Sequence, residues 1–359
     1  MEKINKIFIG GGYSFPNSKK RVGWIDIAKA IAILCIVFGH SMNGTNKIET
    51  ISVAIIYTFH VPVFFLLSSI TCRYSTDFKS FKQNTLKAMK HLLVPAYLIY
   101  LVAIIYSIYL DPNKFYSFQF WKEYILGAVY YTSIPVEYMG LQMPAIFASW
   151  FFIALFLSRV IFDYLQMIIP KAMLFPIVLL TSCIGVALGK HEIFILSFDI
   201  ALAVLPFIYL GYIWKNLEKH NISSLSKVIG VVICFFIWII FSLFTYKDIL
   251  NIVGRRYPLY PLCIIAALAG SYSIIVIAKQ LEKAKIFLPF QFLGRYCIYF
   301  YSIHCIDNIW IDWYKITNND FLNFLTRVAI DLAFFLVVVV IHISITKIIK
   351  AKKLKKKLQ

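Results

Sequence analysis

The stretch from Trp24 to Met42 reads WIDIAKAIAILCIVFGHSM and is apolar over almost its whole length. It is close to the roughly 20 residues that an α-helix needs to cross the hydrocarbon core of a bilayer. Comparable runs follow along the chain, at 51–71, 92–110, 145–164, 172–189, 198–214, 228–246, 258–278, 296–314 and 322–346. The sequence therefore predicts an all-α, polytopic membrane protein with about ten transmembrane helices.

The composition supports this prediction. Of the 359 residues, 60% are hydrophobic and only 15% are charged, whereas soluble domains are about half apolar and a quarter charged. The formal net charge of +19 would suit a nucleic-acid partner, but such proteins gather Lys and Arg on one face of a globular domain. Here the basic residues lie in short stretches between apolar runs, so we expect contact with membrane lipid and none with nucleic acid.

The same basic residues predict the orientation of the chain. With ten spans, the gaps and termini on one side hold 26 Lys and Arg, while the gaps on the other side hold nine if Arg327 is counted with the last gap. Positively charged loops stay in the cytoplasm, so both termini are expected there. We divide the chain into a cytoplasmic segment 1–23, a transmembrane domain 24–346 and a basic cytoplasmic tail 347–359. Residues 115–131 look amphipathic and are expected to lie along the interface.

Two ionisable residues in the first span are the leading functional candidates. Lys29 and His40 are eleven residues apart, so a helix at 100° per residue presents both on nearly the same face. Their axial separation is about 16 Å at 1.5 Å per residue. The structural alternative is that Lys29 extends to the inner interface while His40 is a hydrated histidine at a helix end.

Two further spans carry histidines. His60 lies well inside the second span beside Tyr57, and the ninth span places Tyr301, His304 and Asn308 along one face. Each histidine has a structural alternative as a buried, hydrogen-bonded side chain. Three histidines in three spans are nevertheless more ionisable chemistry than helix packing requires, and we expect them to line a common cavity.

A basic cluster precedes the third span. Lys87 and Lys90 are neighbours on one helix face, after Arg73 in the preceding loop. The cluster suits either contact with anionic lipid or the phosphates of a cytoplasmic donor.

Several fragments together resemble the acyltransferase 3 family of membrane-bound O-acyltransferases, and specifically its fucose 4-O-acetylase-like branch. WIDIAKAIAILCIVFGH is similar to its first helix, FHVPVFFLLSS to its FH-x-P-x-FF-x-LSG stretch, and Lys87-x-x-Lys90 to its paired basic motif. SWFFIALF from Ser149, LPFIYLG from Leu205, and Gly294-Arg295 with YFYSIH from Tyr299 resemble its later elements. The fragments occur in the family's order over roughly residues 21–345.

The chain departs from that pattern at three places. Ser69 stands where the family usually has Gly, Lys29 replaces the commoner Arg, and Tyr296-Cys297 occupies a position where Ser is frequent. Because Arg binds phosphate through a two-pronged fork that Lys lacks, the affinity for a phosphorylated donor is the property that these departures affect.

The resemblance implies transfer of an acyl group, usually acetyl, from cytoplasmic acyl-CoA to a hydroxyl of a cell-surface or lipid-linked polysaccharide. Acetyl-CoA is then the donor substrate, and we expect a multi-pass protein of a bacterial plasma membrane. The candidate catalytic residues are His40, His60 and His304, with His40 as general base or transient acyl carrier. The candidate donor-binding residues are Lys29, Arg73, Lys87 and Lys90. The candidate substrate-binding residues are Tyr57, Trp150, Tyr301 and Asn308.

Other interpretations of the same polar residues remain open. They would also line the path of a polytopic transporter or flippase, although matched pairs of Gly- or Pro-broken helices are not evident. A non-catalytic partner in glycan export is a further alternative. The cysteines show no metal-binding spacing, so we expect no metal. A homo-oligomer is compatible with the sequence.

Overall fold

The structure is a computed structural model that describes residues 22–358, apart from positions 45, 132–134, 139, 146, 191–193, 220–223 and 285–286. Nearly all of the expected N-terminal segment 1–23 lies outside the described residues. The α-helices, in chain order, are α2 (Gly23–Ser41), α3 (Lys47–Thr71), α4 (Phe78–Leu110), α5 (Phe118–Tyr130), α6 (Trp150–Ile168), α7 (Lys171–Gly189), α8 (Phe198–Ala203), α9 (Leu205–Lys219), α10 (Ser224–Phe244), α11 (Leu262–Leu281), α12 (Leu288–Arg295), α13 (Cys297–Trp310), α14 (Trp313–Ile316) and α15 (Asp320–Leu358).

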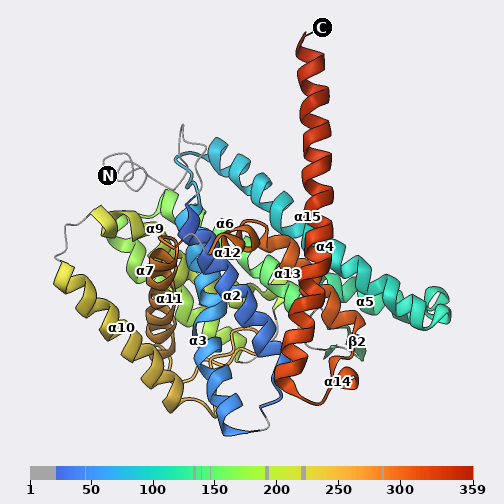
Figure 1. Cartoon of the computed structure of the whole chain (residues 1–359), viewed down its shortest axis with the longest axis horizontal. Coiled ribbons are helices and arrows are strands. Elements are labelled where there is room, and N and C mark those ends of the chain that lie inside the picture. The colour runs from blue at the N-terminus through green and yellow to red at the C-terminus, as the bar shows by residue number, and fades with distance from the viewer. Residues whose placement is uncertain are drawn as a thin grey trace.

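A few short elements complete the fold. Strands β1 (Val136–Tyr138) and β2 (Leu141–Met143) pair as a small antiparallel hairpin that the sequence analysis did not anticipate. Three 3₁₀ turns occupy Pro112–Tyr116, Phe147–Ser149 and Ile195–Ser197. The first of these and α5 cover the segment expected to be amphipathic. The other regular elements among the described residues are helices, as expected (Figure 1).

Seven described helices are long and apolar enough to cross a membrane: α2, α3, α4, α6, α7, α11 and α15. An eighth span arises if α8 and α9, which meet at a bend of 54°, are taken together. The other two expected spans are also helical but shorter. The apolar part of α10 runs over Val228–Phe244, and α13 has 14 residues, which at 1.5 Å each is about 21 Å. The prediction of a polytopic helical membrane protein is confirmed, with seven or eight candidate spans rather than ten.

The third expected span begins much earlier than predicted. α4 has 33 residues and begins at Phe78, where Asp77 caps it: the Asp77 carboxylate accepts from the backbone N–H of Ser80, and the Ser80 hydroxyl oxygen accepts from the backbone N–H of Asp77. Lys87 and Lys90, which the sequence places on one helix face before the third span, lie on this same helix.

The last helix also corrects the sequence analysis. Arg327 was counted with the last outer gap, but it lies inside α15 and only 2% of it is exposed. An arginine can enter this apolar helix because a buried carboxylate faces it, as described below. The basic tail 347–359 continues α15 without a break as far as Leu358, and this end of the helix stands clear of the bundle (Figure 1).

α2 is the central helix. It packs against α3, α11, α12, α13 and α15. Of the residues in its apolar stretch, 61% are buried, compared with 17% in the apolar stretch of α15. Its contact with α12 depends on a glycine: a Cβ at Gly294 would lie 1.7 Å from the backbone oxygen of Asp26. Small residues allow such close approach between membrane helices. Because neighbouring helices pack against α2 on several sides, its polar residues are held at defined positions.

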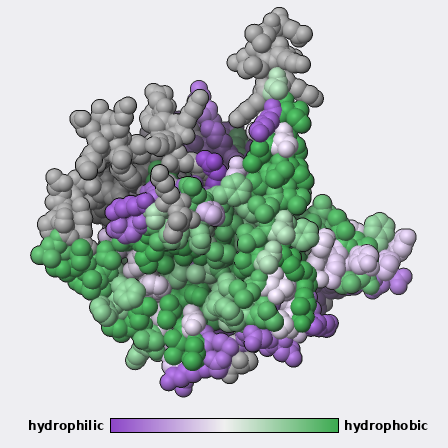
Figure 2. All heavy atoms as spheres, viewed as in Figure 1, coloured by the Kyte–Doolittle hydropathy of each residue, from purple (hydrophilic) through white to green (hydrophobic). Residues whose placement is uncertain are grey.

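The outer surface fits this arrangement. Figure 2 shows a broad hydrophobic area across the face in view, with hydrophilic residues gathered along its lower edge. Large apolar side chains of α10 and α15, such as Phe236, Ile240, Val337 and Val340, are more than half exposed. Such an apolar surface is stable only in contact with lipid or another apolar partner.

Candidate active site

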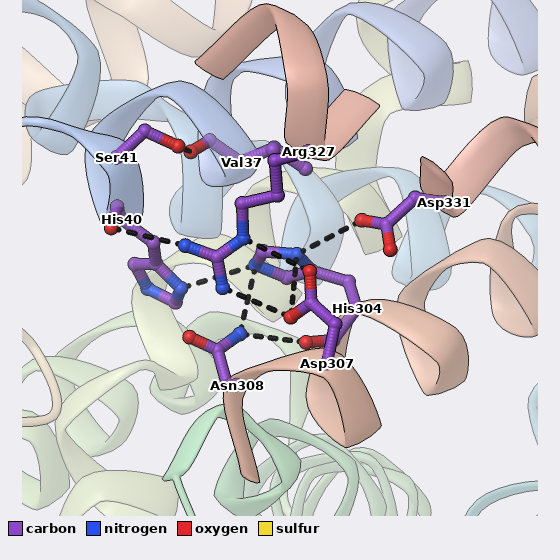
Figure 3. Close-up of polar contacts among 8 residues, drawn as sticks. All are labelled: Val37, His40, Ser41, His304, Asp307, Asn308, Arg327 and Asp331. Carbon is purple, nitrogen blue, oxygen red and sulfur yellow. Dashed lines mark hydrogen bonds and ion pairs between the residues drawn. The ribbon is translucent and has the colours of Figure 1, made fainter. Parts of the chain in front are cut away.

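Helices α2, α13 and α15 bring a polar cluster together at the C-terminal end of α2 (Figure 3). His40 Nδ1 lies 3.1 Å from His304 Nε2, and the two rings stack with centroids 5.2 Å apart and an angle of 26° between their planes. The two residues are 264 positions apart in the chain. If α2 begins in the cytoplasm, as the positive charges predict, this cluster lies at the outer side of the membrane.

A carboxylate lies behind the pair. His304 Nδ1 is 3.3 Å from Asp331 Oδ2 and 3.6 Å from Asp307 Oδ1, and His304 and Asp331 are both fully buried. A carboxylate only accepts hydrogen bonds, so this contact assigns a proton to His304 Nδ1 and leaves His304 Nε2 as an acceptor. His40 then donates from Nδ1, and its Nε2 keeps an unprotonated lone pair. In this arrangement His40 can accept a proton at Nε2.

Arg327 closes the cluster from α15. Its Nε and Nη2 bind the two carboxylate oxygens of Asp307, each at 2.9 Å, and Nη1 donates to the backbone oxygen of His40 at 3.1 Å. Two-pronged pairs of this kind are the strongest side-chain hydrogen bonds, and the ionic partner offsets the cost of a buried guanidinium. Arg327 therefore attaches the end of α2 to both α13 and α15.

Asn308 is the other polar side chain of the cluster. Its Nδ2 donates to the backbone oxygen of His304 at 2.6 Å and lies 3.3 Å from His304 Nε2. Ser41, shown beside the cluster in Figure 3, instead donates to the carbonyl of Val37 within its own helix, at 2.8 Å. Asn308 thus supports the ring that supports His40.

A cavity of about 370 Å³ opens beside His40. Its wall is lined by His40, Tyr106, Asn308, Ile309, Trp310, Ile311, Asp312, Trp313, Tyr314 and Arg327. A volume of this size is at the lower end of the range for small-molecule sites, roughly 300–1,000 Å³. A substrate has room to reach His40.

Three of the clustered groups also have the spacing of a metal site. One ligand atom each from His304, Asp307 and Asp331 lies within 4.8 Å of the others. Asp307 also gives both oxygens to Arg327, so a cation bound here would share this carboxylate with a buried guanidinium.

The comparison with protein families decides the wider class. The model of an acyltransferase domain, that of acyltransferase 3 proteins, matches residues 22–346. The chain belongs to the acyltransferase 3 family. No curated protein and no solved structure matches the chain. The resemblance of the sequence motifs to the acyltransferase 3 family is confirmed at the level of the family, and an integral membrane acyltransferase follows from family membership.

The remaining candidate catalytic residue of this acyltransferase 3 chain is in a different position. His60 is buried in α3, where its Nδ1 lies 2.9 Å from the carbonyl oxygen of Ile56 and its ring packs on Tyr57, with centroids 4.6 Å apart. Among the described contacts, His60 therefore joins residues of its own helix and makes no hydrogen bond to the cluster.

Two candidate substrate-binding residues pack in the hydrophobic core. The Tyr301 hydroxyl donates to the carbonyl of Ala148, and its ring contacts Phe151 and Phe152 edge-on. Trp150 is 5% exposed and meets Phe151 in the same cluster. Neither residue is among those that line the cavity beside His40, whereas Asn308 is.

None of the candidate donor-binding residues is part of the histidine cluster. Lys29 is half-buried in the first half of α2, Arg73 is exposed in the connection before α4, and Lys87 and Lys90 are exposed in the first half of α4. The structure therefore separates the basic candidates from the histidine cluster, as the 16 Å spacing predicts for Lys29.

Sequence analysis missed three charged members of the cluster as candidates: Asp307, Arg327 and Asp331. A signal was available, because ionisable residues inside apolar segments are rare and mark functional or paired sites. Asp331 interrupts an otherwise apolar stretch of the last span, and Arg327 lies one helical turn before it. Their partners, on another helix, are not visible in the sequence.

Proposed function

We propose that the protein is an O-acetyltransferase that moves acetyl from cytoplasmic acetyl-CoA to a hydroxyl of a cell-surface or lipid-linked polysaccharide. The observation that carries the proposal is the chain of contacts from Asp331 through His304 to His40 at the wall of a cavity. Acyl transfer to a hydroxyl needs a base that removes the hydroxyl proton as the oxygen attacks.

His40 is that base. Its Nε2 accepts the proton of the acceptor hydroxyl while the oxygen forms a bond to the thioester carbonyl carbon. The carbon–sulfur bond then breaks, and the proton passes from His40 to the departing CoA thiolate. His304 stabilises the imidazolium that forms on His40, and the Asp331 carboxylate stabilises His304 in turn. In direct transfer no covalent acyl-enzyme forms. In the alternative mechanism with a covalent intermediate, His40 carries the acyl group.

The donor approaches from the opposite side. The exposed Arg73, Lys87 and Lys90 offer positive charge to the phosphates of CoA, and Lys29 lies on α2 between this surface and His40. The long pantetheine arm allows the thioester to reach the histidine while the nucleotide stays near the cytoplasm. A plasma-membrane location and a polysaccharide acceptor follow from this proposal.

The first test compares acetylation of surface glycan by NMR in cells that carry the native protein, His40→Ala or Lys29→Gln, at matched membrane levels. Loss of the base lowers acetylation by at least about 10²-fold. Lys29→Gln weakens transfer in a way that higher acetyl-CoA restores in isolated membranes. His342→Ala is the matched control, because this exposed histidine of α15 contacts Tyr299 rather than the cluster.

The same measurement separates the alternatives. If His40→Ala and Lys29→Gln both acetylate at the native level, the cluster is not the catalytic site, and a transporter or a glycan-export partner becomes the better account. The transporter also predicts that glycan export falls in these variants, whereas the acyltransferase predicts normal export of unacetylated glycan.

A further inference from the structure

Aromatic side chains surround the cavity beside His40. Tyr106 of α4 and Trp310 at the end of α13 lie with ring centroids 5.9 Å apart and their planes 31° from parallel. Trp313 and Tyr314 follow in the short connection to α15. Trp310 is 51% and Tyr314 41% exposed, so part of each side chain is accessible to a ligand. Segment 310–314, WIDWY, was expected to finish a membrane span but instead forms the rim of this cavity.

The cavity wall also has unused hydrogen-bonding capacity. The indole nitrogen of Trp313 is buried and has no hydrogen-bond partner among the described residues. Arg327 uses three of its five N–H groups on Asp307 and His40, which leaves two. A buried donor without a partner costs free energy, so an oxygen-rich ligand that supplies acceptors is favoured.

The charges around the cavity are already paired. Arg327 is bound to Asp307, and Asp312 pairs with Lys315 at 3.1 Å. Among the described lining residues, the charge of Arg327 is therefore balanced by a buried carboxylate and that of Asp312 by an exposed lysine, so neither adds an unbalanced charge to the cavity. This balance favours a neutral ligand over a phosphate, a uronic acid or an amino sugar.

We propose that this cavity is the acceptor subsite and holds one neutral sugar residue, with the apolar face of its ring on Trp310 and Tyr106; this inference rests on the proposed function. The C–H face of a sugar ring buries apolar surface against an aromatic ring, while its hydroxyl edge meets polar groups. Trp313 and Arg327 donate to the sugar oxygens. One hydroxyl points to His40 Nε2, and the rest of the glycan leaves through the open mouth past Tyr314.

A binding measurement tests the cavity apart from catalysis. The purified protein in lipid nanodiscs is examined by saturation-transfer NMR with methyl glycosides of neutral hexoses and of glucuronic acid. Saturation reaches the ring protons of neutral glycosides in the native protein and in His40→Ala, and it falls at least about fivefold in Trp310→Ala, with partial recovery in Trp310→Phe. Tyr109→Ala is the control, since this residue is 78% exposed near the end of α4 and does not line the cavity.

Transfer kinetics give the second measurement. With [¹⁴C]acetyl-CoA and the cell's own surface polysaccharide after alkaline deacetylation, Trp310→Ala raises the acceptor KM at least about tenfold and leaves the acetyl-CoA KM unchanged. A general loss of structure would change both constants, and Tyr109→Ala changes neither.

The outcomes are distinct. The subsite proposal is overturned if neutral glycosides receive no saturation from the native protein, if Trp310→Ala binds them as well as the native chain does, or if only the glucuronide binds. Binding that depends on Trp310, together with no acetyl transfer by the native protein, would refute the proposed function and leave the sugar site in place.

Discussion

Replacing Asp331 with Asn tests the role assigned to the histidine chain, because the substitution changes charge and hydrogen bonding with little change of shape. The carboxylate contacts His304 Nδ1 at 3.3 Å, both residues are fully buried, and Asp331 Oδ1 has no partner among the described residues. Nothing in the described surroundings therefore fixes which end of an Asn amide would face the histidine.

Two outcomes bound the expected loss. If the amide oxygen faces His304, only the charge is lost. A charge-assisted bond exceeds a neutral one by roughly 1–1.5 kcal/mol, which lowers kcat about tenfold. If the amide N–H faces His304, His304 carries its proton at Nε2 and donates it to His40 Nδ1. His40 then carries its own proton at Nε2, which blocks the base. The corresponding change in a serine protease triad costs about 10⁴-fold in kcat. We expect a loss between these limits.

The assay is steady-state acetyl transfer in isolated membranes with matched protein levels, and acetyl-CoA KM is measured alongside kcat. Asp320→Asn is the control: Asp320 is a buried carboxylate on the same helix, but it accepts from the backbone and side chain of Asn43, at 2.7 and 3.0 Å. Its replacement changes kcat less than about threefold. Activity of Asp331→Asn within about twofold of native, in a folded protein, would refute the histidine chain.

Two further predictions concern the packing that holds the site. Arg327→Gln leaves Asp307 as an unpaired buried charge and lowers the unfolding free energy by about 3–5 kcal/mol, whereas the double variant Arg327→Gln, Asp307→Asn loses less. Thermal unfolding in detergent measures both losses. Equal losses would mean that the two residues are not coupled. Gly294→Ala places a methyl group against the Asp26 carbonyl and lowers the unfolding free energy by about 1–3 kcal/mol. Gly230→Ala, where an added methyl group would meet nothing within 4 Å, does not destabilise the protein. Similar melting temperatures for both variants would contradict the α2–α12 contact.

Much of this protein is determined by its sequence alone. Apolar runs of about 20 residues have no stable place in water, so the membrane class and the helical fold follow from composition and length. The order of the motifs predicted the family that the domain comparison shows. The periodicity of the first span was enough to single out His40, because an ionisable residue in an apolar helix requires a partner or a function.

Tertiary structure decided which residues meet. Helical periodicity puts Tyr301 and His304 on neighbouring positions of α13, yet Tyr301 turns to the carbonyl of Ala148 while His304 meets His40. No local pattern could reveal this, because the face that a helix presents depends on neighbours hundreds of residues away. The same holds for Arg327. From the sequence it was assigned to a loop, but in the structure the carboxylate of Asp307 on another helix allows Arg327 to be buried.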